Sequence, residues 1–307
     1  MRRPFAAALA LAVLGFGLTL IFVWADLPGA DPRELDPEPI PTAYTWIHEQ
    51  TAPPPPPSVS LTTRFPAPSG YVRAPLAEGS FGAWLRGLPV RLDRHSVEDY
   101  RGRAVTFSGR WSAAVIALDV GEKNLQQCAD TALRLHAEWL WSRGDTQALR
   151  YHFTSGDESR FSEWVAGRKL AVEGATVREV QVAPVPADRV ALRAWLEQLF
   201  MYAGTRSLAL DSEAVGLDAA LLPGDLLLHP GSPGHVVIVL DVVEREGSGD
   251  QLALIGQGSM PAQELHVLRG DARQTVDGVW FRFPQGREQG VRVPGWGTLQ
   301  RSSARRF

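Results

Sequence analysis

Apolar residues recur with a helical period in two stretches in the middle of the chain. The first begins after Asn124, a residue well suited to an N-cap, and continues until Gly144. The second is preceded by Asp188 and extends from Val190 to about Tyr202. We therefore expect two amphipathic helices, each with one face packed against a core.

Shorter runs of β-branched, aromatic and apolar residues predict strands, most of them in the second half of the chain. The predicted strands are Val105–Phe107, Ala113–Val120, Tyr151–Phe153, Val177–Val182, Leu226–Leu228, His235–Val243, Gln251–Ile255 and Val279–Phe283. Because the helices come early and the strands that look antiparallel come late, we expect an α+β fold rather than a doubly wound parallel sheet.

An uncharged, apolar stretch, Pro4–Ala25, follows Arg2 and Arg3 at the start of the chain. This layout is typical of a secretory signal, and its last residues fit cleavage before Asp26. About 20 apolar residues also span a bilayer, so the segment could instead remain as an anchor in the inner membrane. Both interpretations place the rest of the chain in the periplasm or cell envelope. A third interpretation is a buried helix of the globular domain.

Residues 26–60 contain the Pro53–Pro57 run, six acidic residues and one arginine. Proline fixes the backbone and removes hydrogen-bond donors, so we expect an extended, solvated linker. A proline-rich ligand for a partner module is the alternative interpretation. The remaining residues, 61–307, are long enough for one sizeable core and are expected to form a single α+β domain.

The charge balance and the single cysteine exclude several classes of function. Thirty-one basic and 34 acidic residues leave no positive excess to neutralise phosphates, so we expect no nucleic-acid partner. Cys128 is the only cysteine, which rules out an intrachain disulfide and a thiolate zinc cluster. Asp225, His229 and His235 lack tight ligand spacing, and no dinucleotide, P-loop or HExxH motif occurs. We therefore expect neither a metal nor a cofactor.

Cys128 lies near the start of the first predicted helix, on its apolar face. A thiol in the first turn meets unpaired N–H groups and the positive end of the helix dipole, which lower its pKa and favour the thiolate. These conditions suit a nucleophile. The alternative is a structural cysteine, since free cysteines are among the most buried residues.

His235 opens a long predicted strand, after the Pro223-Gly224-Asp225 turn and a glycine-rich loop. An imidazole at the first residue of a strand is held firmly at the open end of a sheet. A catalytic thiol needs such a base within hydrogen-bond reach, and the two residues need not be neighbours in sequence. The alternative role is a loop histidine that caps a carbonyl.

The order of these motifs resembles the papain-like cell-wall hydrolases of the NlpC and CHAP type. Over residues 65–307 the chain more closely resembles the bacterial family called domain of unknown function 4846, which implies an exported protein without an established activity. The segments that carry this second resemblance are Gly79–Pro89, Leu125–Asp130, Tyr202–Thr205, Gly231–His235 and Ser259–Gln263. The hydrolase resemblance implies a papain-like helix packed on an antiparallel sheet, with family-specific N-terminal additions.

The hydrolase resemblance also implies a third residue that orients the imidazole, taken from a neighbouring strand. Gln257 is the candidate, although a glutamine there could also satisfy a loop backbone. For the oxyanion we expect the backbone N–H of Cys128 together with the side-chain amide of Gln127 or Gln126, with Gln127 preferred. The remaining candidates for substrate binding are Ser259, at the end of the same strand, and His152, which could equally be structural.

Two classes of function follow from these residues. The first is a cysteine peptidase or amidase that cleaves an amide bond in peptidoglycan or another envelope polymer, with Cys128 as nucleophile and His235 as base. The second is a non-catalytic module that binds a glycan or peptide with a hydrolase-like fold. The sequence indicates no oligomeric state.

A cleaved secretory signal predicts that the mature protein begins at Asp26. Mass spectrometry of the N-terminal peptide of the protein purified from its own cells measures this directly. A mature chain that keeps Arg2 and Arg3 would show instead that the apolar segment stays as a membrane anchor.

Overall fold

The computed structural model describes residues 28–48 and 54–307, and the predicted export segment lies outside these residues. The helices are α2 (Thr45–His48), α3 (Leu61–Arg64), α4 (Phe81–Arg86), α5 (Cys128–Ser142), α6 (Phe161–Val165), α7 (Arg189–Tyr202) and α8 (Thr205–Leu208). The strands are β1 (Ser58–Ser60), β2 (Tyr71–Arg73), β3 (Pro89–Arg91), β4 (Ser112–Val115), β5 (Arg150–His152), β6 (Glu158–Arg160), β7 (Arg168–Glu173), β8 (Thr176–Gln181), β9 (Glu213–Ala214), β10 (Leu226–His229), β11 (His235–Arg245), β12 (Gln251–Gln257), β13 (His266–Leu268), β14 (Thr275–Val276), β15 (Trp280–Phe283), β16 (Gly290–Val293), β17 (Gly297–Gln300) and β18 (Ala304–Arg306).

The largest sheet within the described residues has ten strands and is built on the central pair β11 and β12. Seven strands follow the order β14-β15-β12-β11-β10-β18-β9, while β13 and β2 pair with β12 and β11, and β4 pairs with β13. All of these pairs are antiparallel. The predicted α+β class with an antiparallel sheet is therefore confirmed.

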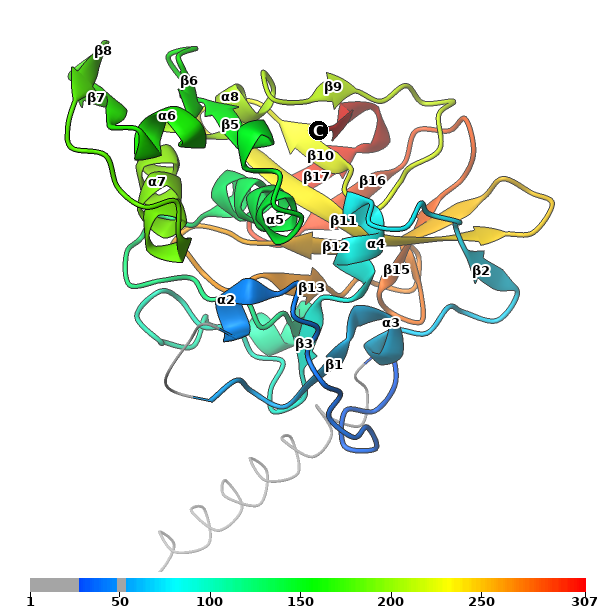
Figure 1. Ribbon diagram of the computed structural model, residues 1–307. Helices are drawn as coiled ribbons and strands as arrows, with labels where there is room; N and C mark the ends of the chain where they lie inside the picture. Colours follow the sequence, from blue (N-terminus) through cyan, green and yellow to red (C-terminus); the bar gives the residue numbers. More distant parts are fainter. Residues whose placement is uncertain (1–27, 49–53) are drawn as a thin grey trace, which may run out of the picture.

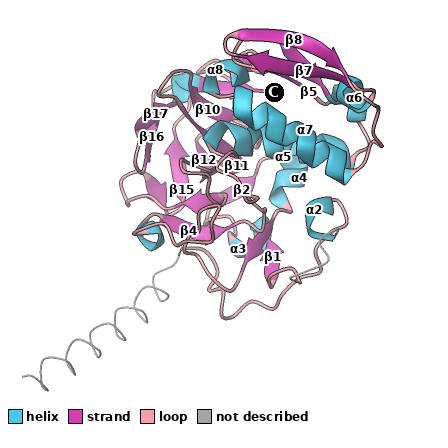
Figure 2. Cartoon of the chain, turned by 90° about the vertical axis from the view of Figure 1, so that its left-hand side faces the viewer, coloured by secondary structure: helices cyan, strands magenta, loops and turns pink. Residues whose placement is uncertain are grey.

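The alternating side chains of β11 separate two hydrophobic cores. Val236 and Ile238 enter the core that α5 and α7 cover, whereas Val237 and Val239 enter a second core beneath the β16–β17 hairpin. Figures 1 and 2 show α5 and α7 beside each other against this sheet. Because both faces are covered, β11 is apolar at consecutive positions rather than at every second one.

The two long helices were predicted with different success at their N-termini. In α7, the Asp188 side chain accepts from the Ala191 N–H at 2.8 Å, which confirms the predicted cap. In α5, the predicted cap at Asn124 is wrong, because the N-cap is Gln127 and the helix begins at Cys128. The Asn124 side chain instead accepts the backbone N–H of Ala262 at 2.7 Å, so a distant loop takes the capping group.

Two predicted strands differ from the structure. Val105–Phe107 is not a strand, because this loop folds back on itself with Phe107 in the left-handed region, at φ 60°. The predicted strand Ala113–Val120 ends at Val115, in β4. Beyond it the backbone leaves the large sheet and contacts β3, where the Ala117 N–H donates to Pro89 at 2.8 Å.

The expectation of a solvated linker over residues 26–60 is wrong for part of that segment. Tyr44, Trp46 and Ile47 are buried in the core beside α4, and the Trp46 indole N–H donates to the carbonyl of Ala117 at 2.8 Å. Aromatic burial therefore ties this stretch to the domain. Of the proline run, Pro54, Pro55 and Pro57 are exposed.

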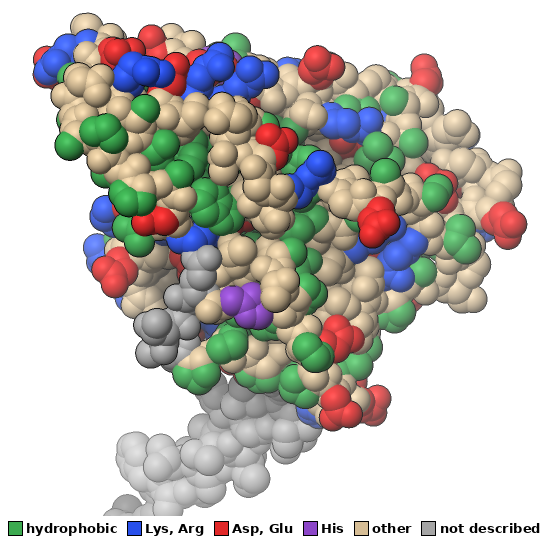
Figure 3. Space-filling model, viewed as in Figure 1, with side chains coloured by type: hydrophobic (Ala, Val, Ile, Leu, Met, Phe, Trp, Pro, Cys, Tyr) green, Lys and Arg blue, Asp and Glu red, His purple; other side chains and the backbone are tan. Residues whose placement is uncertain are grey.

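The surface carries charges of both signs. On the face shown in Figure 3, acidic and basic side chains are interspersed rather than gathered by sign. Within residues 28–48 and 54–307, every helix is too short or too polar to cross a bilayer.

A buried carboxylate joins the segments before α5 to the central strand. Asp241 lies at an irregularity in the β11–β12 pairing and is fully buried. It accepts from Arg73 Nε at 2.8 Å and from Arg86 Nε at 2.6 Å, which anchors β2 and α4 to β11. Both arginines also donate to nearby backbone carbonyls, including those of Phe65 and Ala74.

Because Asp241 is buried between two cations, Asp241→Ala leaves their charges uncompensated. We expect the free energy of unfolding to fall by about 3 kcal/mol. Asp93→Ala, which removes the more exposed partner of Arg91, is the matched control and should cost less than about 1 kcal/mol. Urea denaturation followed by circular dichroism measures both values, and equal losses in the two variants would contradict this account.

Candidate functional site

The N-terminus of α5 lies beside the first residues of β11, where its neighbour β12 has already ended. Ile238 pairs with Gly256, and β12 ends at the next residue, Gln257. Val239 exchanges backbone hydrogen bonds with the β10 side, so the alternate N–H groups of β11 face β12. The N–H of Val236 therefore has no strand partner on that side, and it lies near enough to the Cys128 thiol to lower its pKa.

The chain that leaves β12 packs tightly against the same helix end. A Cβ atom at Gly258 would lie 2.3 Å from Thr131 Oγ1 and 3.1 Å from the Gln127 carbonyl oxygen. Any larger residue would push the strand end away from the first turn of α5. Glycine at this position therefore allows the start of α5, with Cys128, to contact the end of β12, with Gln257.

His235 and Gln257 are brought together by the β11–β12 pairing. The His235 Nε2 atom lies 3.0 Å from Gln257 Oε1, and both side chains are buried. On the outer side, the Trp296 ring from the β16–β17 turn is stacked on the imidazole, with centroids 5.4 Å apart. Trp296 also contacts His229, the cross-strand partner of His235. Sequence reasoning missed Trp296, because nothing local links residues 61 positions apart.

Gln257 has a second partner that sequence reasoning also missed. Its Nε2 atom lies 3.2 Å from Nε2 of His266, which is directly opposite on β13. The other ring nitrogen of His266, Nδ1, lies 2.9 Å from the backbone carbonyl of Glu264. His266 is fully buried and its ring packs against Trp111. Its position in an apolar run gave no signal in the sequence.

Burial, rather than the helix dipole, dominates the ionisation of Cys128. Desolvation raises the pKa of the Cys128 thiol to about 11, and the nearby Asp130 carboxyl acts in the same direction. Backbone N–H groups, including that of Val236, oppose this shift only in part. The expectation of a lowered thiol pKa is therefore wrong, because the half-buried sulfur loses more hydration than the helix N-terminus returns.

The imidazole is neutral in the resting site as well. Burial lowers the pKa of His235, while the hydrogen bond that His235 makes to the Gln257 side-chain oxygen opposes this shift. Among the described residues, no hydrogen bond joins the Cys128 sulfur to the His235 ring. The resting pair is thus a thiol and a neutral imidazole rather than a preformed ion pair.

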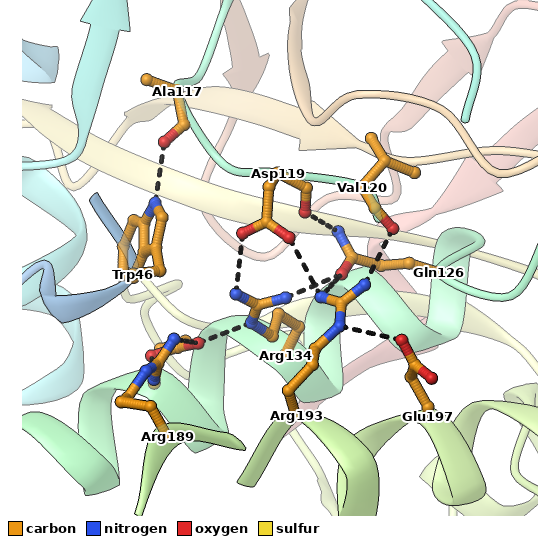
Figure 4. A network of polar contacts seen from close by, with 10 residues as sticks. Trp46, Ala117, Asp119, Val120, Gln126, Arg134, Arg189, Arg193 and Glu197 are labelled. Atoms are coloured by element: carbon orange, nitrogen blue, oxygen red, sulfur yellow. Dashed lines mark hydrogen bonds and ion pairs between the residues drawn. The ribbon is translucent and has the colours of Figure 1, made fainter. Parts of the chain in front are cut away.

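The two candidate oxyanion amides lie in different environments. Gln126 is fully buried in the polar network of Figure 4, where its Nε2 donates to the Asp119 carbonyl at 3.0 Å. Its Oε1 accepts from Arg134 and Arg193, so its amide is not available to a substrate. Gln127 is half-buried, and its side-chain NH₂ makes a long contact of 3.5 Å with the Asn124 carbonyl.

The polar network around Gln126 fixes the approach to α5. Arg134 of α5 is almost fully buried and donates to Asp119 at 3.0 Å and to Glu138 at 2.6 Å. Arg193 of α7 reaches the same Asp119 at 3.1 Å. The loop before Cys128 is thereby held between the two long helices, as Figure 4 shows.

The other two predicted substrate-binding residues, His152 and Ser259, lie outside this polar network. His152 directs Nδ1 to the buried Asp211 at 2.6 Å and lines a cavity of about 680 Å³ with Phe307. Ser259 is half-buried and follows β12 immediately. Within residues 28–48 and 54–307, no group of three histidine, cysteine or acidic side chains is arranged to hold a metal ion.

The family described as a domain of unknown function (4846) matches residues 61–306. The chain belongs to this family. The resemblance to the domain of unknown function 4846 is thus confirmed, whereas no comparison supports the resemblance to papain-like hydrolases. No curated protein and no solved structure matches the chain.

Asp130 is a second titratable group at the start of α5. Its Oδ2 atom accepts the Gln127 N–H at 3.0 Å, while its buried Oδ1 has no hydrogen-bond partner. Desolvation raises the pKa of Asp130 to about 8. The carboxyl group is therefore protonated in the folded protein near pH 7, although it is ionised in the unfolded chain.

Because the pKa of Asp130 is raised in the folded state, the unfolded chain loses this proton at a lower pH than the folded protein. The free energy of unfolding therefore falls as the pH rises from about 4 towards 8. Asp130→Asn imitates the protonated group and keeps an acceptor for Gln127. We expect it to raise the free energy of unfolding by on the order of 2 kcal/mol near pH 8 and by much less near pH 4. Urea denaturation at both pH values measures the difference.

The control is Glu179→Gln, which removes an exposed carboxylate on β8. It should change stability equally little at both pH values. A gain for Asp130→Asn that is the same at pH 4 and pH 8 would show that Asp130 is ionised in the folded protein.

Proposed function

We propose that this protein is a cysteine hydrolase that cleaves an amide bond, with Cys128 as nucleophile, His235 as general base and Gln257 as the orienting residue. The observation that carries the proposal is the 3.0 Å hydrogen bond from His235 to Gln257, made beside the strand end that holds the Cys128 sulfur. A thiol at a helix start, an imidazole at a strand start and a carboxamide behind it supply the parts of a nucleophile, base and orienter.

The neutral resting pair suits general-base catalysis. The Cys128 thiol gives its proton to His235 as the sulfur attacks the amide carbon, and the carbonyl oxygen becomes an oxyanion. His235 then protonates the departing amine, which leaves a thioester on Cys128. Water attacks the thioester with His235 again as base, and the products are a carboxylic acid and the free thiol.

The oxyanion would be stabilised by donors at the start of α5. The Cys128 N–H is one of the first-turn groups that have no acceptor within the helix. The Gln127 side-chain amide belongs to the preceding residue. Its NH₂ makes a long contact with the Asn124 carbonyl, which the oxyanion would replace. Donors of this kind typically contribute about 10²–10³-fold to the rate.

The proposed reaction agrees with a papain-like arrangement of the domain, with α5 packed on an antiparallel sheet and the N-terminal segments as additions. The proposed substrate is a peptide bond of an envelope polymer, for which peptidoglycan stem peptide is the first choice. That choice rests on the basic and apolar start of the chain, which favours export.

A non-catalytic binding module is the second candidate, and one observation favours it. The Cys128 thiol has a pKa of about 11 and makes no hydrogen bond to His235, so the two side chains could serve as uncharged walls of a binding site. Such a module would bind a glycan or peptide without turning it over.

Incubation with purified muropeptides, with products identified by mass, tests the proposed reaction. We expect the wild type to release a new amine and a new carboxyl terminus. Cys128→Ala and His235→Ala should each lower the rate by at least about 10³-fold, and Gln257→Ala by about 10–100-fold. His48→Ala alters an exposed residue remote from the site in sequence and should leave the rate unchanged.

Cleavage that persists in Cys128→Ala would exclude the thiol as nucleophile. Muropeptides that bind to the wild type, by calorimetry, but are never cleaved would favour the binding module. Absence of both binding and cleavage would remove this substrate class for either function.

A further inference from the structure

Four groups form a continuous hydrogen-bonded chain from the candidate base to a backbone carbonyl just before β13. His235 Nε2 is 3.0 Å from Gln257 Oε1, and Gln257 Nε2 is 3.2 Å from His266 Nε2. His266 Nδ1 is 2.9 Å from the carbonyl oxygen of Glu264. All three side chains are buried.

The Glu264 carbonyl, at the end of this series of hydrogen bonds, determines which atom donates in each of them. The Glu264 carbonyl can only accept, so the proton of His266 must be on Nδ1. Burial lowers the pKa of His266 to about 4, so the ring is neutral and its Nε2 carries a lone pair. That lone pair accepts from the amide NH₂ of Gln257, and the amide oxygen must therefore face His235.

We propose that His266 is the positioning residue that makes His235 a base, by fixing the orientation of the Gln257 amide. An amide oxygen facing His235 requires the proton on Nε2 of that ring, which leaves Nδ1 as the unprotonated nitrogen. The proposal rests on the proposed function, because it assigns the nitrogen that would accept the Cys128 proton.

The surroundings of His266 restrict the orientation of the Gln257 side-chain amide. Gln257 and Val115 lie opposite it on the two adjacent strands, and Trp111 packs on its ring. The charged side chain of Glu264 is directed to Arg94, and His235 is the titratable group that lowers the pKa of His266 by its charge. Without an acceptor at position 266, the amide of Gln257 would be free to turn over and present its NH₂ to His235.

Nitrogen-15 NMR of histidine-labelled full-length protein tests the proposal without any substrate. In the wild type, His266 should be the Nδ1–H tautomer and His235 the Nε2–H tautomer at pH 7. The two signals are assigned with His266→Gln and His235→Ala. A wild-type His266 with its proton on Nε2 would overturn the proposal, whatever the protein hydrolyses.

Two variants extend the test to His235. His266→Phe keeps a ring against Trp111 but removes the acceptor, so His235 should change at least in part to the Nδ1–H tautomer. His266→Gln retains an acceptor oxygen and should restore the wild-type tautomer. His48→Gln alters an exposed histidine and should change neither signal. A His235 tautomer that is unchanged in His266→Phe would overturn the proposal.

If the protein hydrolyses muropeptides, His266→Phe should lower kcat by about 10–100-fold with little change in KM, and His266→Gln should recover most of the loss. Wild-type protein that shows the expected tautomers but no hydrolysis would refute the proposed function alone. Should His266→Phe fail to fold, the wild-type tautomers and His266→Gln still decide the question.

Discussion

The difference in length between β11 and β12 is the constraint on which the candidate site depends. Since β12 ends at Gln257, the N–H of Val236 faces a position that no strand fills. The Cys128 thiol lies near that position, where the Val236 N–H lowers its pKa. The same gap brings the helix start, the imidazole and the carboxamide to one end of the sheet.

Burial then sets the electrostatics of this region. The thiol, the Asp130 carboxyl and the two imidazoles of the hydrogen-bonded chain all favour their neutral forms, because each loses hydration without gaining a full opposite charge. The charged side chains of Arg134, Arg193 and Asp119 belong to the neighbouring polar network, where their opposite charges compensate one another. A neutral site supported by a charged network can hold its shape without an ion pair between nucleophile and base.

The sequence was sufficient for the fold class, for the helix capped by Asp188 and for five of the ten strands of the large sheet (β4, β10, β11, β12 and β15), because these elements follow from local periodicity. It failed where a distant residue changed the outcome, as when the Ala262 N–H bound the Asn124 side chain and the helix began three residues later than predicted. Local motifs indicate Cys128 and His235, and the resemblance to cell-wall hydrolases adds Gln257. Their surroundings could not be predicted, because Trp296 and His266 reach them only through strand pairing, and the thiol pKa depends on packing that no local pattern encodes.

The ion pairs of Asp241 with Arg73 and Arg86 limit how far the N-terminal part of this domain can be shortened. Arg73 and Arg86 precede Cys128, Gln257 and His235 in the chain and lie in β2 and α4. A fragment that began at α5 would keep the carboxylate of the central strand but lose both of its counter-ions, and it would have to protonate or expose that group. The minimal unit that keeps this carboxylate compensated therefore includes β2 and α4.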